Sequence, residues 1–149
     1  MNGFDEKAVY SKNIIVDRSM LDENQHVNNV VYVQWMQDIA ILHSEKTGGT
    51  EMMHELDAVW VTRSHKISYY NQAFLNEEVT AITWISNIKR VTSLRKYCFL
   101  RKSDNTILAR GETDWVLIDR KSGRPKKIPP EMIELYPVLP EENEPCRKI

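Results

Sequence analysis

The sequence predicts an α+β fold in which an antiparallel sheet curls around one long helix. Residues 30–46 form the single long segment with helical apolar spacing, and four strand-like runs come closely after it. One helix must then cover the sheet, which favours a sheet that wraps around it. The length of 149 residues suits one domain with a core of its own. We assign residues 1–130 to this domain.

The first strand and the helix are indicated by local patterns. Residues 9–17 read VYSKNIIVD, a run with a β-branched centre that predicts a strand. The helix over residues 30–46 comes next, with apolar side chains at spacings of three and four. These side chains form a broad face that indicates a helix lying deep against a sheet: Tyr32, Trp35, Met36, Ile39, Ala40 and His43. Thr47-Gly48-Gly49 ends the helix, because glycine takes the left-handed conformation that closes a helix.

Four further strands are predicted over residues 58–70, 78–88, 92–102 and 107–119. Turn residues between the later runs favour antiparallel neighbours joined by short hairpins. The acidic, proline-containing tail, residues 131–149, is expected to be loosely ordered.

One helix leaves the second face of the sheet uncovered. Trp60, Trp84 and Trp115 lie in the predicted strands, and a fully solvated face would expose such side chains. We therefore expect self-association of the chain.

Composition excludes several classes of protein. The net charge of −1 argues against a nucleic acid or an anionic membrane as partner. No apolar run approaches the roughly 18 residues of a membrane span, and the N-terminus does not resemble a secretory signal. Cys98 lies in a strand-like run and Cys146 near the C-terminus, so we expect no disulfide framework and a reducing, cytoplasmic setting.

Isolated functional side chains mostly have structural interpretations. His43 lies on the apolar helix face and is interpreted as a hydrogen-bonded core histidine. His54 and His65 have no Cys or His partners at metal-ligand spacing, so no metal is predicted. Met52 and Met53 are interpreted as core side chains that fill gaps. Basic pairs, Arg95-Lys96 and Arg101-Lys102 among them, are interpreted as solvated surface, with the alternative of contacts to coenzyme A phosphates or acidic carrier-protein helices.

The stretch LDENQHVNNVVY, residues 21–32, concentrates polar side chains directly before the helix. Asn28 or Asn29 stands at the N-cap position, and Asp22 and Asn24 suit Asx turns. A second interpretation is catalytic. A helix N-terminus stabilises a developing oxyanion, and the loop supplies a carboxylate, an amide and an imidazole, which are the groups needed for acyl-transfer hydrolysis. The spacing alone does not require catalysis.

The motif itself carries a family resemblance. Residues 22–35, D-E-N-Q-H-V-N-N-V-V-Y-V-Q-W, resemble the D-x-N-x-H-V-N-N-x-x-Y-x-x-W signature of hotdog-fold thioesterases. The resemblance is strongest to the acyl-ACP thioesterase branch, followed by the wider 4-hydroxybenzoyl-CoA thioesterase-like group. The later DWVLID, GRP and IP segments are similar to the last strand and exit of that branch. The resemblance covers residues 9–130. It implies a single hotdog fold, a sheet wrapped around the helix and assembled as a homodimer or dimer of dimers.

The resemblance also implies an activity, the hydrolysis of acyl-CoA or acyl-ACP to a free acid and a thiol without a cofactor. Asp22, Asn24 and His26 match the catalytic residues of the family. Asp22 would attack the thioester or activate water, while Asn24 and His26 would orient water and stabilise the thioester oxygen. Free N–H groups near Asn29 and Val30 would complete the oxyanion site, and the acyl chain would pass Tyr32, Trp35 and Met36.

Two departures from the family pattern bear on this expectation. Plant members carry two hotdog repeats, so a dimer would supply the second one here. Where those members have a catalytic Glu followed by Cys, this chain has Gln72 and Ala73. Gln72 can position water but cannot act as a base, which leaves Asp22 as the ionisable group.

The sequence leaves three other functions open. Gln72 motivates the first, a module that binds acyl thioesters without hydrolysing them. The second is dehydratase or hydratase chemistry on the same fold, for which the sequence holds no motif. The third is a structural or interaction domain in which the polar cluster only caps a helix.

Overall fold

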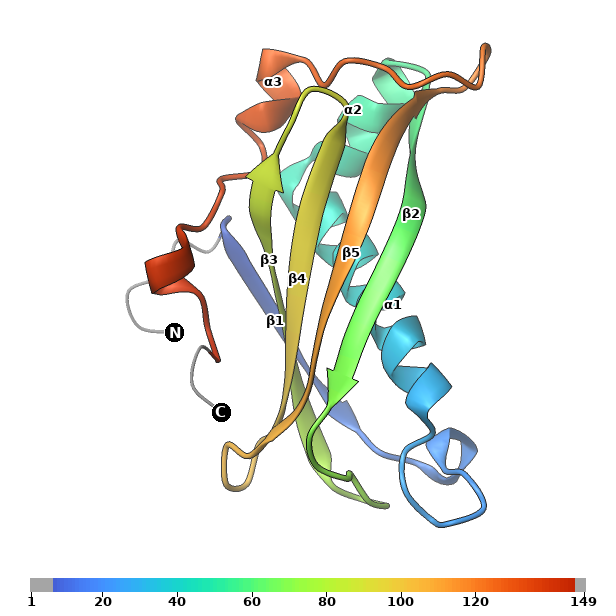
Figure 1. Cartoon of the computed structure of the whole chain (residues 1–149), viewed down its shortest axis with the longest axis vertical. Coiled ribbons are helices and arrows are strands. Elements are labelled where there is room, and N and C mark those ends of the chain that lie inside the picture. The colour runs from blue at the N-terminus through green and yellow to red at the C-terminus, as the bar shows by residue number, and fades with distance from the viewer. Residues whose placement is uncertain (1–6, 147–149) are drawn as a thin grey trace.

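The computed structural model describes residues 7–146, and over them the chain forms a sheet with helices on one side (Figure 1). The elements are, in order, β1 (Val9–Ile15), the 3-10 turn η1 (Arg18–Met20), α1 (Asn29–Thr47), α2 (Gly49–Glu55), β2 (Ala58–Tyr69), β3 (Glu78–Ile88), β4 (Thr92–Arg101), β5 (Ile107–Asp119), α3 (Pro130–Ile133) and the 3-10 turn η2 (Glu141–Asn143). The predicted strands and long helix are confirmed, with ends that differ by at most two residues.

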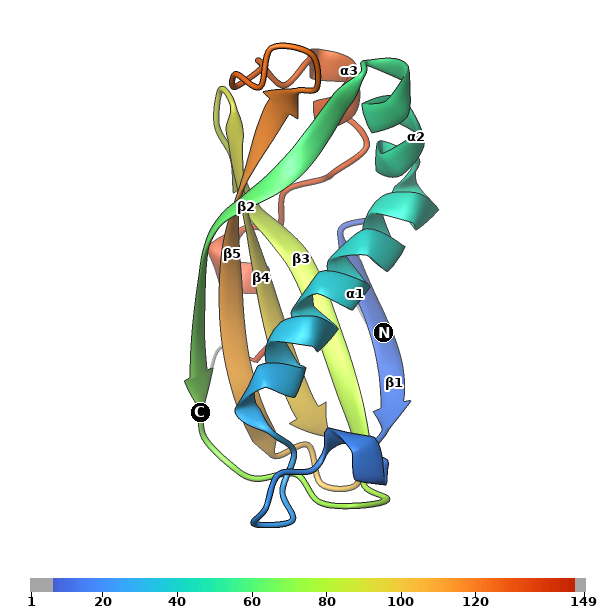
Figure 2. The ribbon, with the colours of Figure 1, turned by 90° about the vertical axis from the view of Figure 1, so that its right-hand side faces the viewer.

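The five strands of the described chain form one sheet in the order β1-β3-β4-β5-β2, and every neighbouring pair is antiparallel. Tight hairpins join β3 to β4 and β4 to β5, as their turn residues predict. The long connection from β1 to β2 carries α1, which crosses one face of the sheet (Figure 2). This is the predicted α+β architecture.

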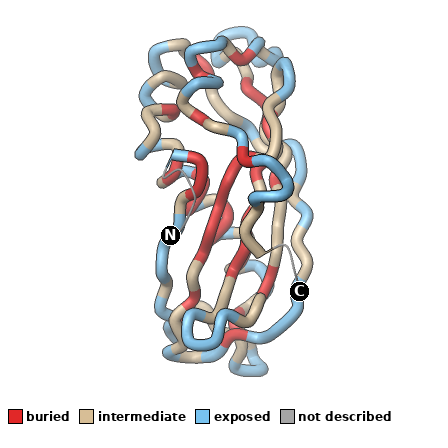
Figure 3. Tube along the Cα trace, turned by 90° about the vertical axis from the view of Figure 1, so that its left-hand side faces the viewer, coloured by how far each residue is buried: buried red, intermediate tan, exposed pale blue. Residues whose placement is uncertain are grey.

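Helix α1 packs on the sheet through the face that its sequence predicts. All six apolar-face side chains are buried: Tyr32, Trp35, Met36, Ile39, Ala40 and His43. All of them except His43 belong to the main core, together with Phe99 of β4 and Leu108 of β5. Each large apolar side chain buried there stabilises the fold by about 1.5–3 kcal/mol. Figure 3 shows that buried residues gather along the middle of the sheet, whereas the loops at its ends are exposed.

The long helix ends at the predicted glycines, but a short helix that was not predicted follows it directly. Gly48 closes α1 with a φ of 91°, but α2 starts at the next residue. Met52 and Met53 of α2 pack against a small cluster that includes Ala58 and Met132, so their predicted gap-filling role is confirmed. Local signals for so short a helix are weak, and its tertiary contacts stabilise it.

Gly49 is required by a close contact. A Cβ atom at this position would overlap the hydroxyl end of the buried Tyr136 side chain. We expect Gly49→Ala to lower the free energy of unfolding by about 1–3 kcal/mol, measured by urea denaturation, because the core around Tyr136 would be overpacked. Gly123→Ala is the control, since nothing lies within 4 Å of a Cβ there and only the positive φ is strained. Equal losses in the two variants would contradict this packing argument.

The tail differs from its predicted looseness: Met132 and Tyr136 pack beside α2, and residues 139–146 pack on the outer face of the sheet. Leu139 is buried, its N–H donates to the carbonyl of Ile85, and Trp84 Nε1 donates to Glu144 Oε2 at 3.0 Å. The reason is the apolar outer face, where Ile82, Trp84 and Cys98 need cover. This cover comes from the chain itself, so Trp84 is no longer an argument for self-association.

Cys98 and Cys146 form a disulfide, which corrects the expectation that the cysteines are unpaired. The two cysteines lie 48 residues apart, and only the path of the tail over β4 brings them together. That path cannot be read from local sequence. A disulfide is typical of oxidising compartments, so cysteine usage no longer supports a reducing, cytoplasmic setting.

His43 is the hydrogen-bonded core histidine that the sequence predicts. Its Nε2 donates to the carbonyl of Lys7 at 2.7 Å, and its Nδ1 accepts from Arg95 Nη1 at 2.8 Å. Arg95 is only 5% exposed, so interpreting it as solvated surface was wrong. The alternation of β4 turns Arg95 inward, while the adjacent Lys96 faces outward and pairs with Glu144 at 3.1 Å.

His43 makes stability depend on pH. Burial, with the Arg95 guanidinium second, lowers the pKa of His43 from 6.5 to about 4. Below pH 6.5 the unfolded chain therefore binds a proton that the folded chain does not. We expect the free energy of unfolding to fall by up to roughly 3 kcal/mol as the pH drops from 6.5 toward 4. Urea titrations across this range should show that slope in the wild type, and an equal slope in His43→Gln would contradict the assignment.

Candidate active site

The polar stretch before α1 forms a tight loop closed by its own backbone. The N–H of Asp22 donates to the carbonyl of His26 at 2.8 Å, and the N–H of Gln25 donates to the carbonyl of Asp22 at 3.1 Å. Gln25 adopts a positive φ of 66° to complete the turn. Asp22 Oδ1 accepts from the N–H of Asn24 at 2.9 Å, so the predicted Asx turn at Asp22 is present. The loop thereby fixes the direction of the Asp22 carboxylate.

The same loop brings two of the three predicted catalytic side chains together. His26 Nδ1 lies 3.9 Å from Asp22 Oδ1, and the two side chains are 28% and 32% exposed. The carboxylate and the imidazole are thus partly shielded but open to solvent. Asn24 lies exposed on the same turn. The arrangement offers a proton acceptor and an adjacent imidazole at the start of α1, which suits general acid–base chemistry.

The start of α1 corrects one expectation about the oxyanion site. Asn28 is the N-cap, and its Oδ1 accepts from the N–H of Val30 at 3.0 Å. The N–H of Val30 is therefore engaged, and the Val30 side chain is exposed. Asn29 begins the helix, and its carbonyl accepts from the hydroxyl of Tyr69 at 2.9 Å. This bond ties the helix start to the end of β2.

A second loop, residues 70–77, lies directly beside the Asp22 loop. The N–H of Val27 donates to the carbonyl of Ala73 at 2.9 Å, and His26 and Phe74 form an isolated antiparallel bridge. The rings of His26 and Phe74 meet edge to face, with centroids 5.7 Å apart. Gln72, which stands where the resemblance implies a glutamate, is exposed on this loop. It lies two residues before Phe74, the residue that pairs with His26.

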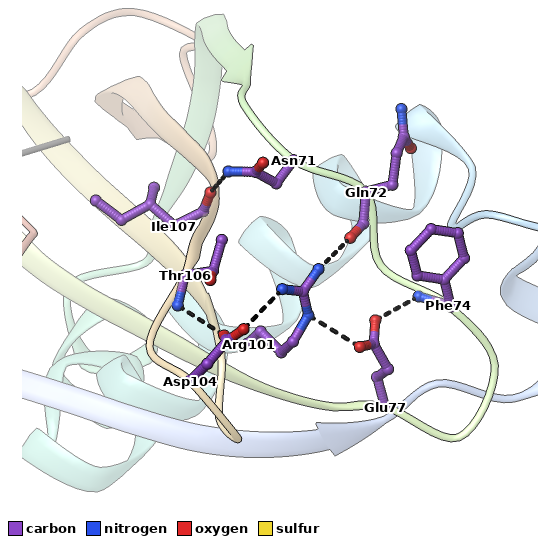
Figure 4. Close-up of polar contacts among 8 residues, drawn as sticks. All are labelled: Asn71, Gln72, Phe74, Glu77, Arg101, Asp104, Thr106 and Ile107. Carbon is purple, nitrogen blue, oxygen red and sulfur yellow. Dashed lines mark hydrogen bonds and ion pairs between the residues drawn. The ribbon is translucent and has the colours of Figure 1, made fainter.

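Arg101 and Glu77 hold the second loop in place, and neither role has a signal in the local sequence (Figure 4). Arg101 Nη2 donates to the carbonyl of Gln72 at 2.9 Å, and Arg101 Nε pairs with Glu77 Oε2 at 2.9 Å. Glu77 Oε1 accepts from the N–H of Phe74 at 2.8 Å. Asp104 completes the set, with Oδ2 at 3.1 Å from Arg101 Nη1. The network fixes the backbone on both sides of Ala73, and that backbone holds the Asp22 loop.

The side chains expected along the acyl chain lie in the core of the monomer. Tyr32 contacts Trp35 and Phe99 edge to face, with centroids 5.0 and 5.4 Å away. Burial raises the pKa of Tyr32 to about 12. Met36 is fully buried and lies against Gly111, where a Cβ would come within 2.8 Å of Met36 Sδ. A pocket along α1 does exist, but its lining starts further along the helix at Gln37.

Metal sites and membrane spans are both absent from the described part of the chain. Residues 7–146 contain no group of three or more His, Cys, Asp or Glu side chains placed to hold a metal ion. Within the same range, none of the helices combines the length and the apolar character that crossing a membrane requires.

Comparison with known proteins decides the family. The family model of the acyl-ACP thioesterase N-terminal domain matches residues 7–136, which is most of the chain. The chain belongs to this family. Among curated relatives of the family, a chloroplastic palmitoyl-acyl carrier protein thioesterase from Cuphea hookeriana is 23% identical over 119 residues. That match covers 74% of this chain but only 29% of the relative.

Solved structures confirm the hotdog fold of this family member. An acyl-ACP thioesterase from Bacteroides thetaiotaomicron superimposes with a TM-score of 0.82 at 18% identity, covering 95% of this chain and 56% of that one. The probable thioesterase YbaW from Escherichia coli gives a TM-score of 0.78 at 20% identity, covering 84% of this chain and 94% of that one. The second match covers nearly all of that chain, so one hotdog unit accounts for the fold seen here.

Proposed function

We propose that this chain hydrolyses the thioester bond of an acyl-CoA or acyl-ACP to a free carboxylic acid and a thiol. The observation that carries the proposal is the placement of Asp22 beside His26 at the start of the buried helix, in a chain of this family. The two side chains come from one loop that its own backbone bonds hold rigid. Preorganised groups of this kind lower the barrier to acyl transfer.

Two routes of thioester hydrolysis are open to these groups. In one route Asp22 accepts a proton from water as the water oxygen bonds to the carbonyl carbon; the C–S bond then breaks, and the thiolate takes up the proton. In the other route the Asp22 carboxylate attacks the carbonyl carbon, the thiolate leaves, and water hydrolyses the resulting anhydride. His26 and Asn24 donate hydrogen bonds to the carbonyl oxygen or to the water in either route. Single turnover in heavy-oxygen water can identify the second route, because label enters Asp22 only when water attacks the Asp22 carbonyl of the anhydride.

Gln72 is proposed to position water rather than to act as a base. Its amide can both donate and accept hydrogen bonds, and the loop that carries it is bonded to the Asp22 loop through Val27 and Ala73. Asp22 is then the only carboxylate that the proposal uses.

A homodimer is proposed as the active assembly. Strand β2 is an edge of the sheet, so one side of its backbone is open to pairing, and Val61 and Tyr69 on it are 42% and 41% exposed. Pairing of two β2 edges about a twofold axis would cover these side chains and place a second sheet beside the Tyr69–Asn29 contact. Light scattering of the purified chain tests this assembly: a dimeric mass supports it and a monomeric mass contradicts it.

The proposed activity is tested with a panel of acyl-CoAs and acyl-ACPs of increasing chain length, scored for released thiol. Turnover on part of the panel supports hydrolysis, and its profile gives the preferred chain and carrier. Saturable binding without thiol release would instead select a binding module. If the chain neither binds nor hydrolyses any member of the panel, the polar loop is left with a structural function alone, as a helix cap.

Arg101 is proposed as a positioning residue for this reaction. We expect Arg101→Gln to lower kcat by about tenfold or more with a smaller change in KM, because the loop beside His26 loses its fixed backbone. Arg101→Lys should restore part of kcat, since it keeps a charge for Glu77 but not the forked contact with Gln72. Lys102→Gln is the control, because exposed Lys102 pairs with Glu78 and has no bond to the loop backbone at Gln72 or Phe74. An unchanged kcat in Arg101→Gln would contradict the role.

A further inference from the structure

A cleft of about 220 Å³ lies on the outer face of the sheet, the face turned away from α1. Residues of four strands, β2 to β5, line this outer-face cleft together with residues 144–146 of the tail. Gly111 of β5 faces Met36 of α1, so strand alternation turns its neighbours Arg110 and Glu112 outward, on the side of the cleft. No lining residue belongs to the Asp22 loop or to the loop of residues 70–77.

Arg110 brings unused hydrogen-bond donors to the outer-face cleft. Its Nε and Nη2 atoms are both buried, and neither has a hydrogen-bond partner. Among the described residues 7–146, Arg110 also forms no ion pair with a carboxylate. Nε and Nη2 lie along one edge of the guanidinium, and their parallel N–H bonds match two oxygens of a single carboxylate or phosphate group. Buried donors of a charged group are costly when they stay unpaired, so this edge favours an oxyanion.

The two carboxylates of the cleft stand beside other cations. Glu144 Oε1 pairs with Lys96 Nζ at 3.1 Å, and Glu144 Oε2 accepts from Trp84 Nε1 at 3.0 Å. Glu112 stands directly opposite Lys66 on β2 and Lys96 on β4. Lysine and arginine side chains therefore outnumber carboxylates in the lining, and the cleft has an excess of positive charge.

Two further donors flank the free edge of Arg110. Ser68 of β2 stands directly opposite Arg110, and Lys66 is its diagonal neighbour on the same strand. Side chains directly opposite one another across a sheet are in contact range, and long side chains also reach diagonal neighbours. A hydroxyl group and an exposed ammonium group can therefore share an anion with the guanidinium.

We propose that the outer-face cleft binds an oxyanion that presents two oxygens from one centre, as phosphate and carboxylate groups do. The anion lies on the Nε–Nη2 edge of Arg110, with Ser68 and Lys66 as additional donors. The site does not depend on the proposed hydrolysis, because it is built on the other face of the sheet from α1.

Calorimetric titration with inorganic phosphate and with acetate, in chloride buffer at constant ionic strength, tests the proposal. We expect saturable binding of at least one probe: preference for phosphate indicates a phosphorylated ligand, and preference for acetate a carboxylate ligand. Arg110→Lys keeps the charge but loses the forked edge, and it should weaken binding by roughly tenfold or more. Arg120→Met is the control and should bind like the wild type, because exposed Arg120 pairs with Asp57 outside the cleft.

Two further variants keep the test decisive. Lys66→Gln changes an exposed side chain, so it should fold normally and weaken binding by about two- to fivefold. In chloride buffer Arg110→Met should melt no lower than the wild type, because it removes buried donors that have no partner. A clear drop in its melting temperature would show that the guanidinium already has a partner in the protein and would overturn the proposal. So would the absence of saturable binding of both probes, or equal binding by Arg110→Lys and the wild type. Asp22→Asn should bind the anion like the wild type, which separates this site from the proposed activity.

Discussion

The Asp22→Asn variant is expected to lose about 10²–10⁴-fold in thioester turnover while it keeps the wild-type melting temperature. The loss arises because an amide can neither accept the proton of water nor attack the carbonyl carbon. The fold should survive because an asparagine Oδ1 still accepts from the N–H groups of Asn24 and His26, as the carboxylate does. Steady-state thiol release and thermal denaturation measure the two effects.

Glu23→Gln is the matched control for Asp22→Asn. Glu23 is exposed on the same loop, and its substitution removes the same charge one residue away. We expect the turnover of this control to stay close to the wild-type rate. Wild-type-like turnover in Asp22→Asn would discard Asp22 as the catalytic carboxylate, and an equal loss in both variants would attribute the effect to the net charge of the loop.

Loss of the Cys98–Cys146 disulfide is expected to have the largest effect on stability. The cysteines are separated by 48 residues, and a cross-link of that span stabilises a folded chain by about 2–4 kcal/mol. We expect Cys146→Ser to lower the melting temperature by roughly 4–16 °C, because about 2–4 °C accompanies each kcal/mol in a domain of this size. Cys146 is the better site for substitution, since it is only partly buried, whereas Cys98 lies in the core.

The disulfide test needs a reduced sample and a control. A thiol reductant should lower the melting temperature of the wild type to that of Cys146→Ser and leave the variant unchanged. Glu144→Gln separates the ion pair with Lys96 from the covalent link, and we expect it to cost much less. A wild type that does not respond to reductant would contradict a stabilising disulfide.

The sheet and the long helix could be predicted well because both depend on local periodicity. The apolar face of α1, from Tyr32 to His43, is buried as its spacing indicates. Turn residues on either side of each strand indicate its boundaries. The exception is α2, a short helix that starts at Gly49. The glycine signal correctly predicts the end of α1, but it carries no information about the next helix.

The candidate site could be predicted in part. The spacing of Asp22 and His26 in one motif places them on one loop, and the structure brings their side chains within 3.9 Å. The roles of Arg101 and Glu77 could not be predicted, because they act across a hairpin and a loop that only the fold brings together. The expectation that the N–H of Val30 is free was wrong, since the cap of Asn28 uses it.

The inward orientation of Arg95 and the packing of the tail could not be predicted from local sequence. A basic pair such as Arg95-Lys96 is typical of surface, but strand alternation sends its two members to opposite faces. Similarly, the tail is polar in composition and yet supplies Leu139 and Glu144 to cover Trp84. In both cases the deciding partner lies far away in the sequence.

Cleavage of thioesters at the Asp22 loop can be measured on the purified protein itself. The protein is incubated with its preferred acyl thioester, and the free acid is quantified by mass spectrometry alongside the thiol. We expect acid and thiol in equal amounts, far exceeding the amount of enzyme, and none above background with Asp22→Asn. An intact thioester that stays bound to the wild-type protein would contradict hydrolysis at this loop.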